Sequence, residues 1–342
     1  MFLTMSTQSH LSMNAIMELE QSTCEASGRT GLERSSEKAA SPLSTAEGLT
    51  MSNKAQLPIR APSKRTREAL DVLDGSYLIG GSLGQGGYGQ VYSAVRRSDN
   101  ASVAIKIIRK YKMDPFYDDA KEVCLMRRLA HIPGVIKLLD VHYINKLLVI
   151  VMERIENSMN LDEFSNTNEF TPLLAQKFFR ELVEILNQCL ASGVIHHDVK
   201  PENILVDRQN QTIKLIDFGS GTYHRSSYTK SRGTDLFLPP EYYRYKAYDG
   251  EAATVWSLGV LLFIIMYKRM PFDHMYKYIT NQTTETDIDF PENDSVPPQC
   301  RILLEDILVF DVDKRPSLKD ILAHPAANWL TCPWFDLSEV EE

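Results

Sequence analysis

Three glycines near the start of a strand-rich region are spaced as in loops that hold a phosphate group. The stretch runs Gly84-Gln-Gly86-Gly-Tyr-Gly89-Gln-Val91 and follows the pattern G-x-G-x-x-G-x-V. Glycine lets the backbone approach a phosphate closely and present its N–H groups to it. A dinucleotide-binding turn also uses three glycines, but it needs them between a strand and a helix. Here a strand pattern, Val91 to Val95, follows directly, so we predict a hairpin loop that closes over the phosphates of ATP.

A lysine follows the glycine loop at a suitable distance for a phosphate site. Val103-Ala104-Ile105-Lys106 reads as the third strand, and Lys106 is the candidate to pair the α- and β-phosphates. Glu122, within the helical pattern that comes next, is the carboxylate best placed to hold this lysine. Its rivals, Asp118 and Asp119, lie a turn earlier, where an acid simply favours the helix dipole. We therefore expect an ion pair between Lys106 and Glu122.

Two further motifs supply groups for phosphoryl transfer. They are His196-His197-Asp198-Val199-Lys200-Pro201-Glu202-Asn203 and Asp217-Phe218-Gly219. Asp198 is expected to orient a substrate hydroxyl and take its proton, and Lys200 to neutralise charge on the transferring phosphoryl group. Asn203 and Asp217 are the expected Mg²⁺ ligands. Phosphoryl transfer needs such a set because it depends mainly on positioning and charge neutralisation, and four motifs in this order and spacing do not arise by chance.

These motifs lie on two kinds of predicted structure. Strand patterns fill the region before about residue 153, and one helix, Asp118 to Leu129, interrupts them. The strand runs are Tyr77 to Ile79, Val91 to Val95, Val103 to Ile108, Val135 to Leu139 and Leu147 to Met152. From about residue 172 helical spacing dominates, in Leu173 to Ala191 and in the buried helix Val255 to Tyr267. We predict an α+β protein with a small strand-rich lobe, a larger helical lobe and a ligand site at their junction.

Composition narrows the class of protein further. The chain has 342 residues, of which 43% are hydrophobic, so it has enough apolar material for a core and is not a fibrous or mostly disordered chain. Its net charge of -8 argues against a nucleic-acid partner. The longest apolar run, Val255 to Tyr267, is too short for a membrane span. Five scattered cysteines indicate reduced thiols, so we expect residence in the cytoplasm or the nucleus, with no membrane partner.

Changes in composition and periodicity along the chain predict three segments. Residues 1–73 are rich in Ser and Thr without sustained periodicity, so we predict a disordered N-terminal tail. Its basic cluster of Lys64, Arg65 and Arg67 reads as a solvated run of charge, with a localisation or docking patch as the alternative. Residues 74–330 form the predicted domain, and residues 331–342 a short acidic tail.

The region from Tyr77 to Leu330 resembles a eukaryotic protein kinase domain, and within that superfamily the Pim serine/threonine kinases. The resemblance rests on Leu83 to Ser93, Arg97 to Asn100 before Val-Ala-Ile-Lys, Leu215 to Gly221, Gly233-Thr through Pro239-Pro240-Glu241, and Ala253 to Gly259. The last stretch lacks the aspartate that most kinases place before Val-Trp-Ser, which is also a feature of the Pim family. Glu241 has a natural partner in Arg315, and we predict that they form a buried ion pair.

The resemblance implies a bilobed fold and a full set of binding residues. The small antiparallel-sheet lobe, with one main helix, covers about residues 74–154, and the mostly helical lobe covers about residues 155–330. Mg-ATP is the implied phosphate donor. The adenine is implied to lie between Leu83, Val91, Ala104, Leu205 and Ile216, with Met152 at its back and Glu153 to Ile155 as the hinge. A monomer is implied as well.

The resemblance also implies protein substrates that carry the acceptor Ser or Thr in Arg-rich sequences. Lys200 fits the serine/threonine pattern, and Glu202 matches a position that pairs with a substrate arginine, with Asp162 as a helper near the hinge. Asp162 and Glu163 read equally well as a solvated face. The alternative function is a kinase-like scaffold without activity, but such chains usually lack at least one of the catalytic groups that are present here.

Three departures from the family bear on regulation and specificity. His197 stands where most kinases have an arginine that pairs with an activation-loop phosphate, so we expect activity without that phosphorylation. Ile155 replaces the hinge proline of Pim kinases and keeps its N–H. The segment Tyr228 to Gly233 is basic where the family tends to be acidic, which weakens the implied preference for Arg-rich substrates.

Overall fold

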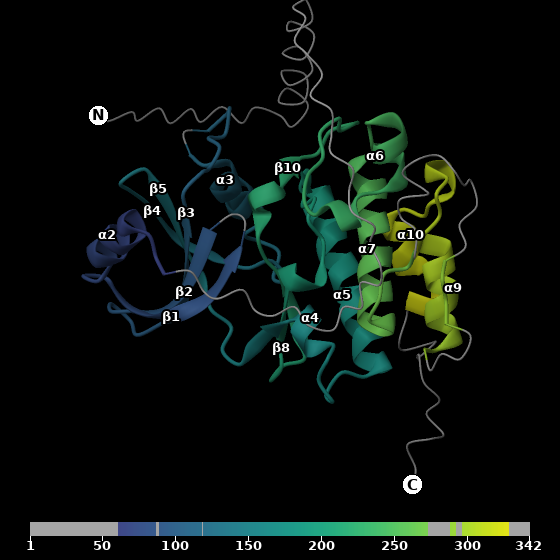
Figure 1. The fold of residues 1–342 in the computed structure, drawn as a ribbon, viewed down its shortest axis with the longest axis horizontal. Helices are drawn as coiled ribbons and strands as arrows, with labels where there is room; N and C mark the ends of the chain where they lie inside the picture. Colours follow the sequence, from purple (N-terminus) through teal and green to yellow (C-terminus); the bar gives the residue numbers. More distant parts are fainter. Residues whose placement is uncertain (1–60, 87–88, 118, 273–287, 292–295, 328–342) are drawn as a thin grey trace, which may run out of the picture. The chain divides into compact units, whose positions relative to one another are not determined.

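The computed structural model describes residues 61–86, 89–117, 119–272, 288–291 and 296–327. Within these residues a small strand-rich lobe precedes a larger, mainly helical lobe (Figure 1), which is the α+β, bilobed arrangement that the sequence predicts. Residues 1–60 of the predicted tail, Gly87 and Tyr88 of the glycine loop, and the acidic residues 331–342 lie outside the described residues.

The N-terminal lobe is built on one antiparallel sheet of five strands in the order β1-β2-β3-β5-β4. The strands are β1 (Tyr77–Gly86), β2 (Gly89–Arg96), β3 (Ser102–Ile108), β4 (Leu138–Ile144) and β5 (Leu147–Glu153). Side chains of β5 alternate between two cores, because Val149 and Val151 face one cluster while Leu148 and Ile150 face the other. Both faces of the sheet are therefore covered, which explains the unbroken apolar run in β5.

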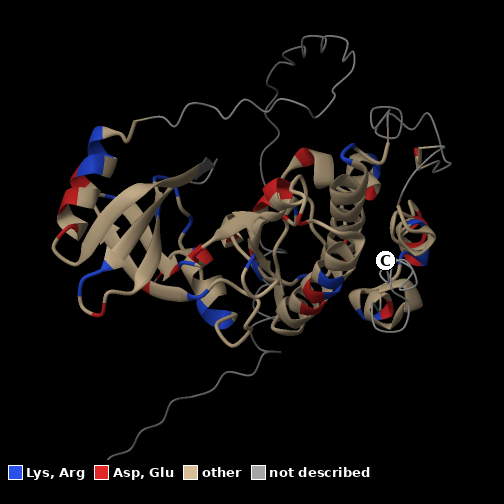
Figure 2. Cartoon of the chain, turned by 90° about the horizontal axis from the view of Figure 1, so that it is seen from below, with Lys and Arg blue, Asp and Glu red and all other residues tan. Residues whose placement is uncertain are grey.

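A helix that the sequence analysis assigned to the disordered tail covers one face of this sheet. Helix α2 (Lys64–Leu73) begins at Ser63, whose hydroxyl accepts a hydrogen bond from the Thr66 N–H, and it buries Ala69 and Leu73 in the outer core. The predicted tail to residue 73 is therefore wrong for residues 64–73. One buried stripe in a helix of ten residues is too short a pattern to separate from a polar tail. The basic residues of its first turns are exposed, and Figure 2 shows acidic ones following them.

Two other predicted boundaries are corrected. Strand β4 begins at Leu138 rather than at Val135, because Val135 pairs with Leu215 in an isolated parallel bridge to the C-terminal lobe. Helix α3 (Lys121–Arg128) is shorter than the predicted helix, and Ala120 is its N-cap residue. Asp118, where we had expected the helix to start, lies outside the described residues.

Helix α7 (Gly250–Tyr267) forms the centre of the C-terminal lobe. All of its residues from Ala253 to Ile265 are buried, as the apolar run predicts. A Cβ added to Gly259 would lie 2.7 Å from the side chains of Ile307 and Leu308, so this glycine allows α9 to pack closely. By length and composition alone α7 could cross a membrane, but it is the core helix of this lobe. The other helices here are α4 (Leu161–Phe164), α5 (Pro172–Ala191), α6 (Pro240–Tyr245), α9 (Pro298–Ile307) and α10 (Leu318–Ala323).

Short strands and single 3₁₀ turns complete the helical lobe. The strands are β6 (Ser158–Asn160), β7 (Val194–Ile195), β8 (Ile204–Asp207), β9 (Thr212–Leu215) and β10 (Thr222–Tyr223). The 3₁₀ turns are η1 (Pro201–Asn203), η2 (Phe218–Ser220), η3 (Asp235–Phe237), η4 (Val312–Lys314) and η5 (Pro325–Ala327). Strands β8 and β9 form a hairpin whose two ends lead into the two catalytic motifs, so these motifs lie side by side.

The predicted pair of Glu241 and Arg315 is present and fully buried. Arg315 Nη1 and Nη2 donate to the two carboxylate oxygens of Glu241 at 2.9 and 3.0 Å, and Nη1 also donates to the carbonyl of Ala252. This bidentate pair fixes the end of the segment that begins at Asp217 to the body of the lobe.

Replacing Leu73 by alanine should lower the free energy of unfolding by about 2–4 kcal/mol, because it leaves a cavity under α2. The matched control is Val72→Ala, which removes a side chain that is 63% exposed and should change stability by less than about 0.5 kcal/mol. Urea unfolding of both variants gives the comparison. Equal effects at the two positions would contradict the packing of α2 on the sheet.

Removing one partner of the Glu241–Arg315 pair should be costly. Arg315→Met should destabilise the protein by about 3–5 kcal/mol, since it leaves the Glu241 carboxylate buried without its partner. The double variant with Glu241→Gln should recover part of that loss because no charge then remains buried. Urea unfolding of the single and double variants measures the difference, and a double variant less stable than Arg315→Met would speak against this account.

Candidate active site

The predicted lysine lies between two carboxylates at the junction of the lobes. Lys106 on β3 has its Nζ 2.6 Å from Glu122 Oε1 on α3 and 2.8 Å from Asp217 Oδ1, which follows β9. Only 6% of the lysine side chain is exposed. Asp119, the described rival of Glu122, instead contacts Arg127 and Tyr143. The structure thus brings together the strand, the helix and the Asp-Phe-Gly motif as the sequence analysis expects.

The two carboxylates determine the charge state of the lysine. Burial by itself favours the neutral amine, but the charges and hydrogen bonds of Glu122 and Asp217 outweigh it and raise the pKa of Lys106 above its usual value. Burial likewise works to raise the pKa of Asp217, yet the Lys106 ammonium and the Gly219 N–H bring it below its ordinary value. The site therefore holds a protonated lysine beside an ionised Asp217 at neutral pH.

A left-handed backbone conformation aims Asp217 at the site. Asp217 has φ 64° and ψ 80°, and its carboxylate accepts a hydrogen bond of 3.1 Å from the Gly219 N–H at the start of η2. Aspartate tolerates this region better than most residues because its short side chain bonds locally to the backbone. His196 supports the same turn by a 2.9 Å hydrogen bond between its Nε2 and the carbonyl of Ile216.

The predicted base, Asp198, is almost completely buried and its carboxylate is held from several sides. Asn203 Nδ2 donates to Asp198 Oδ2 at 3.0 Å, and Lys200 Nζ lies 3.1 Å from the same oxygen. The Thr234 hydroxyl donates to Asp198 Oδ1 at 2.8 Å and accepts a hydrogen bond from Lys200 at 2.7 Å. Thr234 was missed as a functional residue, although it belongs to the Gly233-Thr stretch that carried the family resemblance.

The predicted nucleotide-binding residues lie around the N-terminal sheet. The glycine loop joins β1 and β2 as a hairpin, and a Cβ on Gly89 would lie 2.3 Å from the carbonyl oxygen of Ile107, so only glycine fits there. Ala104 on β3 is directly opposite Met152 on β5. Val91 and Ile216 are partly buried against the same core, Leu83 is half exposed, and Leu205 lies on β8.

At the expected hinge, the Glu153 carboxylate is held by partners from both lobes. Its Oε1 accepts hydrogen bonds from the Lys137 N–H and from Lys214 Nζ, at 2.9 and 2.8 Å. The carbonyl of Ile155 accepts a 2.8 Å hydrogen bond from the hydroxyl of Ser158. If this hinge contacts a nucleotide, it does so through its backbone, because the Glu153 side chain is already used.

The donor set fits Mg²⁺ in the presence of phosphates. Within the described residues no group of three or more His, Cys, Asp or Glu side chains is placed to hold a metal by itself. Asp217 and Asn203 lie on neighbouring segments, as the 3.0 Å hydrogen bond from the Ile216 N–H to the Asn203 carbonyl shows, and their side-chain oxygens would be the ligands. Mg²⁺ commonly binds through one or two protein oxygens together with substrate phosphates and water.

Comparison with known proteins assigns the family. The family model for the protein kinase domain matches residues 77–327. The chain belongs to the protein kinase family.

Three relatives give the degree of similarity. The chain is 34% identical over 271 residues to serine/threonine-protein kinase prk-2 of Caenorhabditis elegans, and the match covers 77% of this chain and 61% of that relative. It is 32% identical over 298 residues to serine/threonine-protein kinase pim-2 of Danio rerio, covering 81% and 92%. It is 34% identical over 307 residues to NUAK family SNF1-like kinase 2 of Homo sapiens, covering 88% and 47%. The chain thus spans less than two thirds of two of these relatives.

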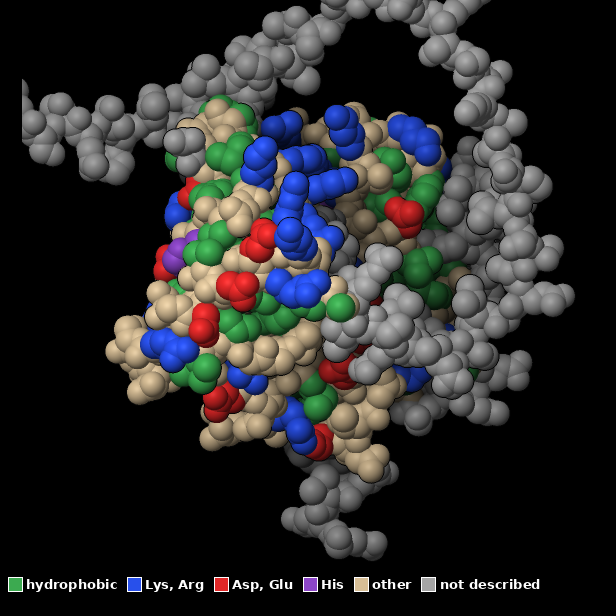
Figure 3. All heavy atoms as spheres, turned by 60° about the vertical axis from the view of Figure 1, so that its left-hand side comes forward, with side chains coloured by type: hydrophobic (Ala, Val, Ile, Leu, Met, Phe, Trp, Pro, Cys, Tyr) green, Lys and Arg blue, Asp and Glu red, His purple; other side chains and the backbone are tan. Residues whose placement is uncertain are grey.

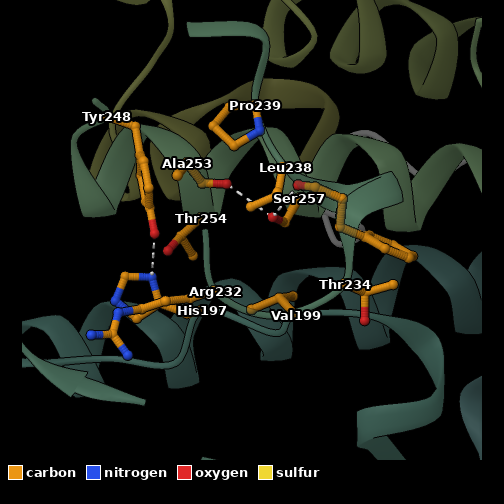
Figure 4. Close-up of a pocket in the computed structure, with 11 residues that line it drawn as sticks. His197, Val199, Arg232, Thr234, Leu238, Pro239, Tyr248, Ala253, Thr254 and Ser257 are labelled. Carbon is orange, nitrogen blue, oxygen red and sulfur yellow. Dashed lines mark hydrogen bonds between the residues drawn. The ribbon is translucent and has the colours of Figure 1, made fainter. Parts of the chain in front are cut away.

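In this kinase the histidine of the catalytic loop lies in an aromatic cluster rather than at a free anion site. The His197 ring is 4.6 Å from the ring of Tyr228 and 6.0 Å from that of Tyr248, both edge-on, and the two tyrosines stack. His197 is also hydrogen-bonded to Thr222 Oγ1 at 2.8 Å and to the Tyr248 hydroxyl at 3.5 Å (Figure 4). These contacts join the catalytic loop to the first half of the segment between Asp217 and Glu241 and to Tyr248, which follows that segment.

The surroundings of His197 keep it neutral. Burial, together with the charges of Arg232, His196 and Lys121, lowers the pKa of His197 to about 3. Tyr228 ties the cluster to the segment backbone, since its N–H and carbonyl pair with Tyr248 and its hydroxyl donates to the Tyr223 carbonyl at 3.0 Å. A neutral, packed histidine thus occupies the place from which a charged arginine would contact a phosphate.

The predicted substrate-binding acids lie on neighbouring elements. Glu202 is on η1, which packs against α4, and α4 carries Asp162; both side chains are half-buried. A lysine that the sequence analysis did not consider lies near Asp162. Lys268 ends α7 and donates to the Ser165 carbonyl; burial lowers its pKa to about 8, while Asp162 opposes that shift. The positive charge of Lys268 is therefore close enough to interact with Asp162.

The neutral His197 makes stability depend on pH in a defined direction. Because its pKa is about 3 in the fold and about 6.5 in the unfolded chain, the unfolded state binds the additional proton as the pH falls below 6.5. The contribution of His197 should lower the free energy of unfolding by about 2 kcal/mol between pH 7.5 and pH 5. Urea unfolding of His197→Gln should show a shallower loss, whereas the exposed control His131→Gln should keep the wild-type slope. Identical slopes for wild type and His197→Gln would refute this assignment.

Proposed function

We propose that this kinase is an active serine/threonine protein kinase, which transfers the γ-phosphate of Mg-ATP to Ser or Thr hydroxyls of protein substrates. The observation that carries the proposal is the complete catalytic set in one site, with Lys106 on both Glu122 and Asp217 and with Asp198 held by its neighbours. Two of the relatives are named serine/threonine-protein kinases, which supports the choice of acceptor.

Each side chain has a part in the transfer that its contacts support. Lys106, positioned by Glu122, is placed to bind the α- and β-phosphates of ATP. Asp198 faces the acceptor hydroxyl, aligns it and accepts its proton, and Lys200, next to it, offsets charge on the transferring group. Asn203 and Asp217 would hold Mg²⁺, which when bound neutralises phosphate charge. Because phosphoryl transfer depends on positioning and charge, this set is sufficient without a covalent intermediate.

The proposal includes activity without phosphorylation of the activation segment, Asp217 to Glu241. Three kinds of contact support an ordered segment: the aromatic cluster of His197, Tyr228 and Tyr248, the bond of Thr234 to Asp198, and the buried Glu241–Arg315 pair. Each of these contacts is made by unmodified side chains, so the order of the segment does not require a phosphate. The alternative of an inactive scaffold would keep the fold, but it has no need of an aligned and buried Lys106–Glu122–Asp217 set.

The test is transfer of labelled phosphate from Mg-ATP to serine and threonine peptides by the full chain. Wild type should transfer phosphate, and Asp217→Asn and Lys106→Met should each lower the rate by roughly 100-fold or more. Asp198→Asn should lower transfer similarly while ATP still binds, which separates the chemistry from folding. Prior treatment of the enzyme with phosphatase should leave the rate unchanged. Binding of ATP without transfer to any peptide would favour the scaffold, and loss of activity after phosphatase would remove the proposed independence from phosphorylation.

The proposed preference for arginines before the acceptor rests on Glu202 and Asp162. Glu202→Gln should raise KM for an Arg-containing peptide by about tenfold, because a charge-assisted hydrogen bond is lost, and should change KM little for a peptide without arginine. Asp162→Asn should have a smaller effect because Lys268 already opposes the Asp162 charge. Equal KM changes for the peptides with and without arginine would mean that these acids do not bind the substrate arginine.

A further inference from the structure

Cations gather on the activation segment and on helix α3, which packs against the start of that segment. Within the activation segment Lys230 is exposed and Arg232 is half-buried, and neither side chain has an ion-pair partner among the described residues. On the facing helix α3, Lys121 and Arg128 lie over the ring of Tyr223 at 5.5 and 5.8 Å. Figure 3 shows Lys and Arg side chains gathered in the upper part of its view.

Arg232 is anchored next to the catalytic base. A Cβ on the following residue, Gly233, would lie 2.1 Å from the carbonyl oxygen of His197 and 3.1 Å from Asp198 Oδ1, and Gly233 has φ 79°. The backbone at Gly233 is therefore packed directly on the catalytic loop. Arg232 itself lines a pocket with His197, Thr234 and Tyr248 (Figure 4).

The charges of these cations change the pKa values of neighbouring side chains. Burial is the main cause of the low pKa of His197, and the charges of Arg232 and Lys121 lower it further. Burial raises the pKa of Tyr248, and the charge of Arg232 opposes that rise. Two of the acids in this part of the structure are hydrogen-bonded, and a third is exposed. Asp114 bonds to Tyr223, Asp249 caps α7 through the Ala252 N–H, and Asp235 is exposed. A positive region thus borders the place where the acceptor hydroxyl meets Asp198.

We propose that Arg232 and Lys230 bind an anionic side chain of the substrate that follows the phosphoacceptor residue. The favoured substrate is then bipolar, with arginine before the acceptor on Glu202 and a carboxylate or phosphate after it. Arginine recognises both anions by paired, charge-assisted hydrogen bonds, and lysine adds a point charge. This inference rests on the proposed kinase activity and specifies its substrate class.

The experiment compares kcat/KM of the phosphatase-treated full chain for four peptides of equal length. Three carry arginine before the acceptor serine and glutamate, glutamine or phosphoserine after it. The fourth carries the same charges in reverse order. The glutamate peptide should exceed the glutamine peptide about tenfold, which corresponds to one charge-assisted contact, and the reversed peptide should have no such advantage. Comparison of the glutamate and phosphoserine peptides tells which anion the site prefers.

Variants assign the preference to the named side chains. Arg232→Gln together with Lys230→Gln should bring the ratio of glutamate to glutamine peptide to about one. The matched control Lys314→Gln removes a cation that is 76% exposed on η4 and should keep the wild-type ratio. Three results would each overturn the proposal. Wild type could have equal kcat/KM for the glutamate and glutamine peptides, or the double variant could keep the preference for glutamate. The third is a kcat/KM for the reversed peptide that equals the value for the glutamate peptide.

Peptide binding separates this inference from the proposed activity. Fluorescence anisotropy of the same peptides, measured on wild type and on the double variant, needs no phosphate transfer. Tighter binding of the glutamate peptide that is lost in the double variant would support the anion site even if no peptide were phosphorylated. Equal binding of the glutamate and glutamine peptides would overturn the anion site even if transfer to serine were robust.

Discussion

The ammonium of Lys106 is the group on which the active arrangement of both lobes depends. It belongs to a strand of the sheet lobe, and its two partners come from α3 and from the turn after β9 in the helical lobe. Since its side chain is almost fully buried, a rotation of α3 or a flip of the Asp217 backbone would leave the ammonium in the interior with only one of its two carboxylate partners. The penalty for separation, rather than the strength of the pair itself, holds the three elements in register.

At the activation segment the cost of burying a charge is avoided by a neutral side chain, whereas Lys106 is charged and paired. Around His197 the neighbouring charges, Arg232 and Lys121, are both positive, so a third cation there would be repelled and desolvated together. A neutral imidazole avoids this cost and packs against Tyr228 and Tyr248 instead. Aromatic packing does not require a modification to supply negative charge. The substitution of histidine for arginine is thus consistent with a segment that is ordered by packing, while its cations remain open to other anions.

Local spacing predicted the parts of this site that lie on long or highly patterned elements. The glycine hairpin, the Lys106–Glu122 pair and the buried Glu241–Arg315 pair could be read from order and residue type. Helix α2 could not, because its single buried stripe acquires meaning only from the sheet face on which it packs. Neither could the start of β4 or the contact of Thr234 with Asp198, since both depend on partners far away in the chain. Tertiary contacts decide such positions, and a local pattern does not contain them.

The net charge of the whole chain does not show that the site contains both an acidic and a basic group of side chains. A net charge of -8 suggests a cationic partner, and the acids Glu202 and Asp162 agree with that reading on one side of Asp198. Lys268 weakens the acidic side, whereas Arg232 and Lys230 make the other side positive. Recognition at a surface depends on charges within about 10 Å, because salt screens those farther away. In the proposed substrate complex, each half of the substrate meets its own local field, and neither field follows from the sum of charges over the chain.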